Sequence, residues 1–220
     1  MGAYAQGNIA FNVGDHTLNV LENRRRLQQN LSLTAWSELN QVHGDVMHLD
    51  PEPTPLNNPL LPAADGLATT QPGLALVIKT ADCQPVLLAS LDGKHIAALH
   101  VGWKGNRIGF IDRAVKEFCA HYRLSPRDLV AVRGPSLSPA NSQFTNFDAE
   151  WGPEFLPWFN QENRSMDLWR LTHHQLMEAG LESRNIFGLD FCTFERADLF
   201  FSHRRDRGTS GRQASLIWIA

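Results

Sequence analysis

A chain of 220 residues is long enough for one domain with a sizeable core, and its 43% of hydrophobic residues argues against disorder. The formal net charge of −3 lacks the basic excess that is typical of proteins binding nucleic acids or membrane surfaces. No apolar stretch approaches the roughly 18 to 20 residues of a membrane span. The N-terminus lacks a secretory signal, and three cysteines, an odd number, form no disulfide framework. We therefore expect a cytoplasmic protein.

In the first half of the chain, apolar residues at helical spacing predict a helix over 19–31. A segment with five prolines follows over 49–66, and its composition excludes a helix or a central strand. Apolar runs of strand length then occur at 74–80, 85–90 and 95–101, with a turn at 91–94 between the last two.

In the second half, a helix is predicted over 105–122, with one apolar stripe formed by Ile108, Ile111, Val115, Phe118 and Tyr122. A capped helix start is expected at 125–128, because proline suits the first helical position. The remaining elements are predicted in chain order as a strand from 129 to the Gly134–Pro135 turn, a helix over 167–179 closed by Gly180, and strands over 185–192 and 214–219. Strands and helices alternate irregularly, so we expect a single α/β domain over residues 1–220, a layered sandwich with a mixed, largely antiparallel sheet.

The most informative single residue is Cys83, which follows Asp82 at the end of an apolar run. The common signatures of zinc proteases, paired C-x-x-C sites, phosphate-binding loops and serine hydrolases are absent from the sequence. Three interpretations stay open: a packed structural thiol, a nucleophile, and one ligand of a metal site. A lone cysteine at a strand end is most often a packing residue, so the metal interpretation needs partners.

Two histidines are suitable partners for Cys83. His100 ends the neighbouring predicted strand, and His43 lies in "NQVHGD" before a glycine. His95 is on the same predicted strand as His100, but an odd separation sends the two side chains to opposite faces. One cysteine and two histidines leave the fourth position of zinc open, as catalytic zinc sites do.

Two basic segments are candidate anion sites. "GWKGN" places Lys104 and backbone N–H groups at a predicted helix start, although an ordinary strand-to-helix turn explains it equally well. "FFSHRRDRGTSGR" offers Arg204, Arg205 and Arg212, whose planar guanidinium groups suit phosphate. A solvated surface loop is the alternative for these arginines.

Taken together, "NQVHG", "ADGLATTQPGLALVIKTADCQPVLL", "AALHVGWKG" and "CTFERADLFFSHRRDRGTSGRQASLIWI" resemble the laccase-domain proteins. These proteins are also called multi-copper polyphenol oxidoreductases, peptidoglycan editing factors and purine nucleoside phosphorylases. The resemblance runs from about Tyr4 to the last residue. The combined set of motifs is specific for this family, although no single motif would be.

The resemblance implies an α/β sandwich that binds zinc through His43, Cys83 and His100. It also implies phosphorolysis of adenosine, inosine and methylthioadenosine, and deamination of adenosine. Copper-dependent phenol oxidation is the older assignment for such proteins, and copper is the less favoured metal here, because one site with three ligands cannot form several copper centres.

The chain departs from the family pattern in three places. It lacks the strand and "TR-x-GG" turn that usually precede the segment starting at Tyr4. The cysteines of "GPSIGPCCYEV" are replaced by Ala140 and Asn141, and the glutamate by Gln143. Lys104 stands where arginine is common and keeps the positive charge.

The leading hypothesis is a zinc-dependent enzyme that acts on purine nucleosides and phosphate, as a monomer or weak homodimer without nucleic-acid or membrane partners. Asp82 is a candidate catalytic residue beside Cys83, either as a proton acceptor or by orienting its neighbours. Asn8 and Gln41 are candidate nucleoside contacts, and the arginines after Ser202 are candidate phosphate ligands. The alternatives are editing of cell-wall precursors and a non-catalytic protein that binds zinc or a nucleotide.

Overall fold

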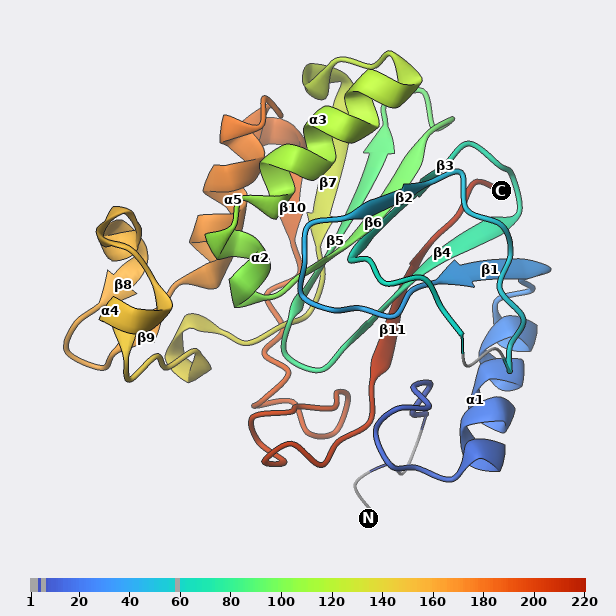
Figure 1. The fold of residues 1–220 in the computed structure, drawn as a ribbon, viewed down its shortest axis with the longest axis horizontal. Helices are drawn as coiled ribbons and strands as arrows, with labels where there is room; N and C mark the ends of the chain where they lie inside the picture. The colour runs from blue at the N-terminus through green and yellow to red at the C-terminus, as the bar shows by residue number, and fades with distance from the viewer. Residues whose placement is uncertain (1–3, 5–6, 58–59) are drawn as a thin grey trace.

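Two β-sheets packed face to face form the centre of the computed structural model (Figure 1). The model describes residues 4, 7–57 and 60–220. The other N-terminal residues, used above to argue against a signal sequence, and two positions of the proline-rich segment lie outside the described residues. Leucine, isoleucine and alanine side chains from both sheets fill the space between them. The expected layered α/β sandwich with a mixed, largely antiparallel sheet is confirmed.

The larger sheet has six strands, in the order β10-β7-β5-β6-β3-β2. Its two outer pairs are parallel and the three inner pairs antiparallel. The strands are β2 (Met47–Leu49), β3 (Gly66–Thr69), β5 (Gln84–Ser90), β6 (Ile96–Val101), β7 (Leu129–Arg133) and β10 (Ile186–Gly188). As predicted, β5 and β6 form a hairpin around the turn at 91–94.

The smaller sheet has three strands in the order β1-β4-β11, with β1 (Ala35–Glu38), β4 (Leu74–Thr80) and β11 (Gln213–Ile217). The continuous apolar run of β4 is explained by burial on both faces. Leu76 and Ile78 face the larger sheet, whereas Ala75 and Val77 pack on the opposite side with Trp36. A separate two-stranded ribbon, β8 (Phe159–Asn160) and β9 (Ser165–Met166), belongs to an aromatic subdomain beside the sheets.

Helices cover both outer faces of the sandwich (Figure 1). Three of them pack on the larger sheet, and α1 packs on the smaller one. Their bounds are α1 (Thr17–Asn30), α2 (Trp103–Arg107), α3 (Phe110–Tyr122), α4 (Phe147–Glu150) and α5 (Leu168–Glu178), with short 3-10 turns at 126–128, 139–141, 153–158 and 183–185. None of the described helices has the length and apolar character that crossing a membrane requires.

Three predicted elements are corrected by the structure. The capped helix start expected at 125–128 is a three-residue 3-10 turn, Pro126–Asp128, without a side-chain cap. The helix expected over 105–122 is two helices, because Gly109 adopts a left-handed conformation with φ of 73°. The break turns Ile108 outward, so it is exposed and does not belong to the buried stripe. The strand expected over 185–192 ends at Gly188, and the chain beyond it carries exposed apolar side chains.

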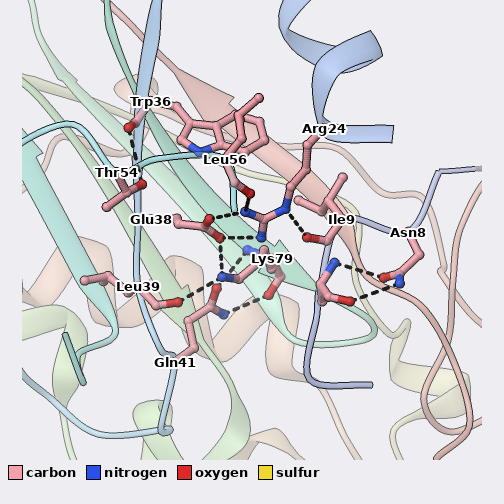
Figure 2. A network of polar contacts seen from close by, with 11 residues as sticks. Asn8, Ile9, Arg24, Trp36, Glu38, Leu39, Gln41, Thr54, Leu56 and Lys79 are labelled. Carbon is pink, nitrogen blue, oxygen red and sulfur yellow. Dashed lines mark hydrogen bonds and ion pairs between the residues drawn. The ribbon is translucent and has the colours of Figure 1, made fainter. Parts of the chain in front are cut away.

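A buried ion network joins α1 to the smaller sheet (Figure 2). Arg24 and Glu38 form a two-point pair with N–O distances of 2.5 and 3.0 Å, and both side chains are almost fully buried. Lys79 of β4 binds the same carboxylate at 2.5 Å and the carbonyl of Leu39 at 3.0 Å. Arg24 also donates to the carbonyl of Ile9 and stacks on Phe11, so the network fixes the N-terminal segment against the sheet.

Replacing Glu38 with alanine should lower the free energy of unfolding by roughly 3 to 5 kcal/mol, because two buried cations lose their shared partner. Urea unfolding followed by circular dichroism measures this loss. The control is Glu22→Ala, because the Glu22–Arg26 ion pair on α1 is exposed and should be worth less than about 1 kcal/mol. Equal small losses for both variants would contradict the importance of the buried network.

Candidate metal centre and its cavity

His43, Cys83 and His100 come together at one edge of the sandwich, and their ligand atoms all lie within 4.8 Å of one another. Cys83 Sγ is 3.7 Å from His43 Nε2, and the two imidazole ring centroids are 4.7 Å apart. The sequence places these residues 40 and 17 positions apart, so the fold alone assembles the group. A four-coordinate zinc ion with bonds of about 2.0 to 2.3 Å requires ligand atoms at about this spacing.

Strand register explains why His100 meets Cys83. In the β5–β6 hairpin, Pro85 pairs with His100, so the next positions outward bring Cys83 close to Gly102. Cys83 ends the bend of residues 81–83, through which the chain passes from the smaller sheet to the larger one. At Asp82 the backbone adopts φ of 88°, which makes this passage abrupt.

The buried carboxylate of Asp65 holds the two histidines in place. One oxygen lies 2.7 Å from His100 Nδ1 and accepts the backbone N–H of His43 at 3.0 Å. The other accepts the N–H groups of Val42 and Gly44. A carboxylate on Nδ1 leaves Nε2 of His100 to serve as the metal ligand, an arrangement common in metal sites.

The lowered pKa of Cys83 favours metal binding, whereas the raised pKa of His100 opposes it. Burial raises the pKa of the Cys83 thiol, but the charge and hydrogen bonds of His100 and His43 outweigh it and lower the pKa to about 6. Burial lowers the pKa of His100, but Cys83 and Asp65 outweigh it and raise the pKa to about 9. A thiolate is the form of cysteine that binds metal. The imidazole of His100 has to release a proton when a metal ion binds, so metal affinity should fall as the pH is lowered.

A cavity of about 740 Å³ opens beside this group. The volume lies within the range of sites for small organic ligands. All three candidate ligands line it, together with Trp103 and Phe144, which give it an aromatic wall. The cavity is also lined by the N-terminal segment 10–13 and by Arg24 and Lys79 of the buried ion network, and we call these residues its far wall.

Asp82 lines the cavity, but its carboxylate is engaged elsewhere. One oxygen accepts the hydroxyl of Thr193 at 2.7 Å and the other accepts the backbone N–H of Arg204 at 2.7 Å. Through these bonds Asp82 holds the C-terminal basic segment over the cavity. The geometry therefore favours the orienting role for Asp82, while its role as a proton acceptor stays a prediction.

The two candidate nucleoside contacts also make structural bonds. Gln41 lines the cavity, and its amide pairs with the backbone N–H and C=O of Lys79, which continues the β1–β4 ladder beyond Glu38. Asn8 is fully buried, bonds to Ala10, Asp15 and Arg212, and is not among the residues that line the cavity. The structure does not bring Asn8 to the site.

The basic residues divide into two groups. Lys104, Arg204 and Arg212 line the cavity. Burial lowers the pKa of the Arg212 guanidinium, and the charges of Cys83 and Asp82 oppose this effect. Arg205 does not line the cavity, and its five donors all have acceptors within the protein: Thr193 O, Phe194 O, Phe200 O and both carboxylate oxygens of Asp206. Arg205 therefore has no donor left for phosphate.

Buried oxygens of three cavity-lining residues, Thr80, Gln84 and Ser142, have no hydrogen-bond partner among the described residues. The amide orientation of Gln84 is fixed by a relay. Gln175 Nε2 donates to the backbone carbonyl of Asn106, so its Oε1 accepts from Asn106 Nδ2. Asn106 Oδ1 then accepts from Gln84 Nε2. Gln84 Oε1 is left as an acceptor, which a ligand N–H or a water satisfies.

Comparison with known proteins agrees with this architecture. A family model described as multi-copper polyphenol oxidoreductase laccase matches residues 1–220. The chain belongs to this family. Relatives in the family include the purine nucleoside phosphorylase of Xylella fastidiosa strain Temecula1, 37% identical over 97% of this chain and 84% of the relative. Another is the purine nucleoside phosphorylase YfiH of Escherichia coli K12, 34% identical over 98% of this chain and 87% of the relative.

Solved structures of the same family share the fold. YlmD from Geobacillus stearothermophilus superimposes with a TM-score of 0.87 at 28% identity, covering 100% of this chain and 87% of that one. A Bacillus licheniformis protein, YfiH, gives a TM-score of 0.86 at 28% identity over 97% of this chain and 85% of that one.

Several residues around the candidate site could not be recognised from the sequence. Asp65 lies within the quoted "ADGLATT" motif, directly before β3, but nothing in the sequence pairs it with His100. His203, Phe144 and the N-terminal segment 10–13 also line the cavity. No spacing rule brings these distant segments together.

The two histidines of the β6 segment should differ in their effect on metal content. His95 contacts Ser90 and Tyr122, away from the metal group. His95→Ala should therefore keep one metal ion per chain after purification without chelator, whereas His100→Ala should lose it. Elemental analysis of the folded variants measures this difference. Metal loss in His95→Ala with retention in His100→Ala would show that the site is elsewhere.

Gly102 should be intolerant of a side chain. A Cβ atom there would lie 2.9 Å from His43 Cδ2 and 3.1 Å from Cys83 Sγ, so Gly102→Ala displaces two ligands. We expect a loss of metal affinity of at least about tenfold, the scale on which disturbed ligand support acts. In the matched control, Gly105→Ala, the new atom meets neighbours only at 3.8 Å or more. Competition with a chromophoric chelator should show unchanged affinity for the control, and equal affinities would refute the steric argument.

Proposed function

We propose that the protein is a zinc-dependent enzyme that acts on purine nucleosides. It cleaves adenosine, inosine and methylthioadenosine with phosphate and deaminates adenosine. The observation that carries the proposal is a group of three candidate metal ligands on the wall of a cavity of about 740 Å³ that also has basic side chains. The relatives named purine nucleoside phosphorylase support the same substrate class.

The donor set of one thiolate and two imidazoles favours zinc, and three protein ligands leave a position open to the cavity. When bound there, zinc supplies a Lewis acid that lowers the pKa of a coordinated water. Asp65 orients His100 for this purpose, and His43 is held by the same carboxylate.

The reaction with phosphate needs a basic subsite beside the nucleoside. In phosphorolysis the bond from ribose C1′ to the purine nitrogen breaks, a C1′–oxygen bond to phosphate forms, and the base leaves with a proton. Arg204 and Arg212 line the cavity and are the proposed phosphate ligands, and Lys104 adds positive charge at the rim. Asp82 positions Arg204 through its backbone N–H.

The purine has a matching set of contacts in the proposed pose. The aromatic wall of Trp103 and Phe144 suits a planar base. Gln84 Oε1, fixed as an acceptor by the amide relay, suits the exocyclic amino group of adenosine better than the oxygen of inosine. Adenosine is therefore the substrate that we expect to be used best.

The test is release of adenine from adenosine by the zinc-loaded protein, with and without phosphate. Adenine and ribose 1-phosphate should appear in equal amounts and only with phosphate, while ammonia release by deamination should not need it. Loss of one charged hydrogen bond, about 1.5 to 3 kcal/mol, should raise the KM for phosphate of Arg212→Ala roughly 10- to 100-fold. Ammonia release should change far less.

Arg184→Ala is the control, because Arg184 is 81% exposed and paired with Glu182 on the surface. Loss of both reactions to the same extent in Arg212→Ala would assign Arg212 to the fold instead. Turnover of cell-wall precursors but not of nucleosides would favour the editing activity, and no turnover of either would favour a binding protein.

A further inference from the structure

The far wall of the cavity carries an excess of positive charge. Arg24 and Lys79 both line the cavity, and both bind the single carboxylate of Glu38 behind it. The two-point contact with Arg24 already neutralises Glu38. Lys79 therefore adds one positive charge that no described side chain balances at this wall.

Lys79 is held so that it faces the cavity. Along β4, the side chains of Ala75 and Val77 alternate with those that face the larger sheet, and Lys79 continues their row. Its ammonium group donates to Glu38 and to the carbonyl of Leu39, as Figure 2 shows. An ammonium group has three donors, and no described residue accepts the third. The side chain keeps 12% of its surface exposed, toward the cavity that it lines.

A role in stability alone does not account for Lys79. The Arg24–Glu38 pair is complete without it, and a buried charge that is not fully paired costs stability. Burial lowers the pKa of Lys79, and the charge of Glu38 works against this effect. An anion in the cavity would complete the pairing of the ammonium group and remove the penalty.

The neighbouring charges also favour an anion. Arg212 directly precedes Gln213, which pairs with Thr80, the neighbour of Lys79 in β4. Arg212 lines the same cavity. Among the described lining residues, Asp82 is the one carboxylate, and both of its oxygens already accept hydrogen bonds.

We propose that Lys79, supported by Arg24 and Glu38, forms a binding subsite for a phosphate group at the far wall of the cavity. A compact ammonium with a free donor suits the high charge density of a phosphate oxygen. The phosphate is either free orthophosphate or the phosphate ester of a nucleotide. The inference rests on the proposed function only for this choice of anion.

The subsite is tested by thermal unfolding of the metal-loaded full chain at constant ionic strength, with orthophosphate, adenosine or adenosine 5′-monophosphate as the probe. Ligand at ten times its Kd should raise the Tm of the wild type on the order of 3 to 5 °C. Lys79→Met should reduce this shift and still fold, because Arg204 and Arg212 remain in the cavity and Glu38 keeps Arg24 as its partner. Lys79→Gln is the second variant, should methionine impair folding. Lys94→Met, on the exposed turn, is the control and should keep the full shift.

The outcomes separate the sources of the phosphate. A smaller orthophosphate shift in the Lys79 variants than in the wild type supports the subsite with free phosphate as its ligand. Loss of only the additional shift of adenosine 5′-monophosphate over adenosine supports it with a nucleotide as the ligand. No shift in the wild type, or the same shift in the Lys79 variants, overturns the subsite. The thermal shift does not depend on turnover. A Lys79-dependent shift in a protein that fails to cleave nucleosides in the separate activity assay would therefore refute the proposed function and leave the subsite standing.

Discussion

The carboxylate of Asp65 is the interaction on which the site depends. It binds three consecutive backbone N–H groups at 42–44 and Nδ1 of His100, so one side chain fixes both candidate histidine ligands. His43 is held at φ of 60°, a conformation that costs on the order of 1 to 3 kcal/mol in a residue other than glycine. Burial raises the pKa of Asp65, and the hydrogen bonds outweigh it and lower the pKa, which keeps the carboxylate ionised.

The position of the cavity follows from the passage of the chain between the two sheets. β4 belongs to the smaller sheet and β5 to the larger one, and residues 81–83 join them. Lys79 lies just before the bend and Cys83 at its end, and both side chains line one cavity. Asp82, in the middle of the bend, ties down the C-terminal basic segment, which closes the cavity from a third direction.

Two kinds of feature could be predicted from the sequence: elements with a regular spacing of apolar residues, and the faces of residues that are an odd or even number of positions apart on one strand. The β5–β6 hairpin, α1 and α5 follow from repeated apolar spacing, and the odd separation of His95 and His100 predicted that one of them faces away. The strands β1, β2 and β3 have only three or four residues, too few to show a period. Asp65 and Lys79 act through partners 35 and 41 positions away, and only the register of the sheets brings such pairs together.

The residues that line the cavity provide three kinds of contact. Around the metal group, the thiolate of Cys83 and the carboxylate of Asp65 surround His100, so this end favours a cation. The far wall has a surplus cation at Lys79 and favours an anion. The uncharged aromatic side chains of Trp103 and Phe144 line the same cavity, as does Gln84, whose Oε1 has no hydrogen-bond partner among the described residues. A ligand with a planar base and an anionic group satisfies all three regions at once, whereas a phenol has no group for the far wall.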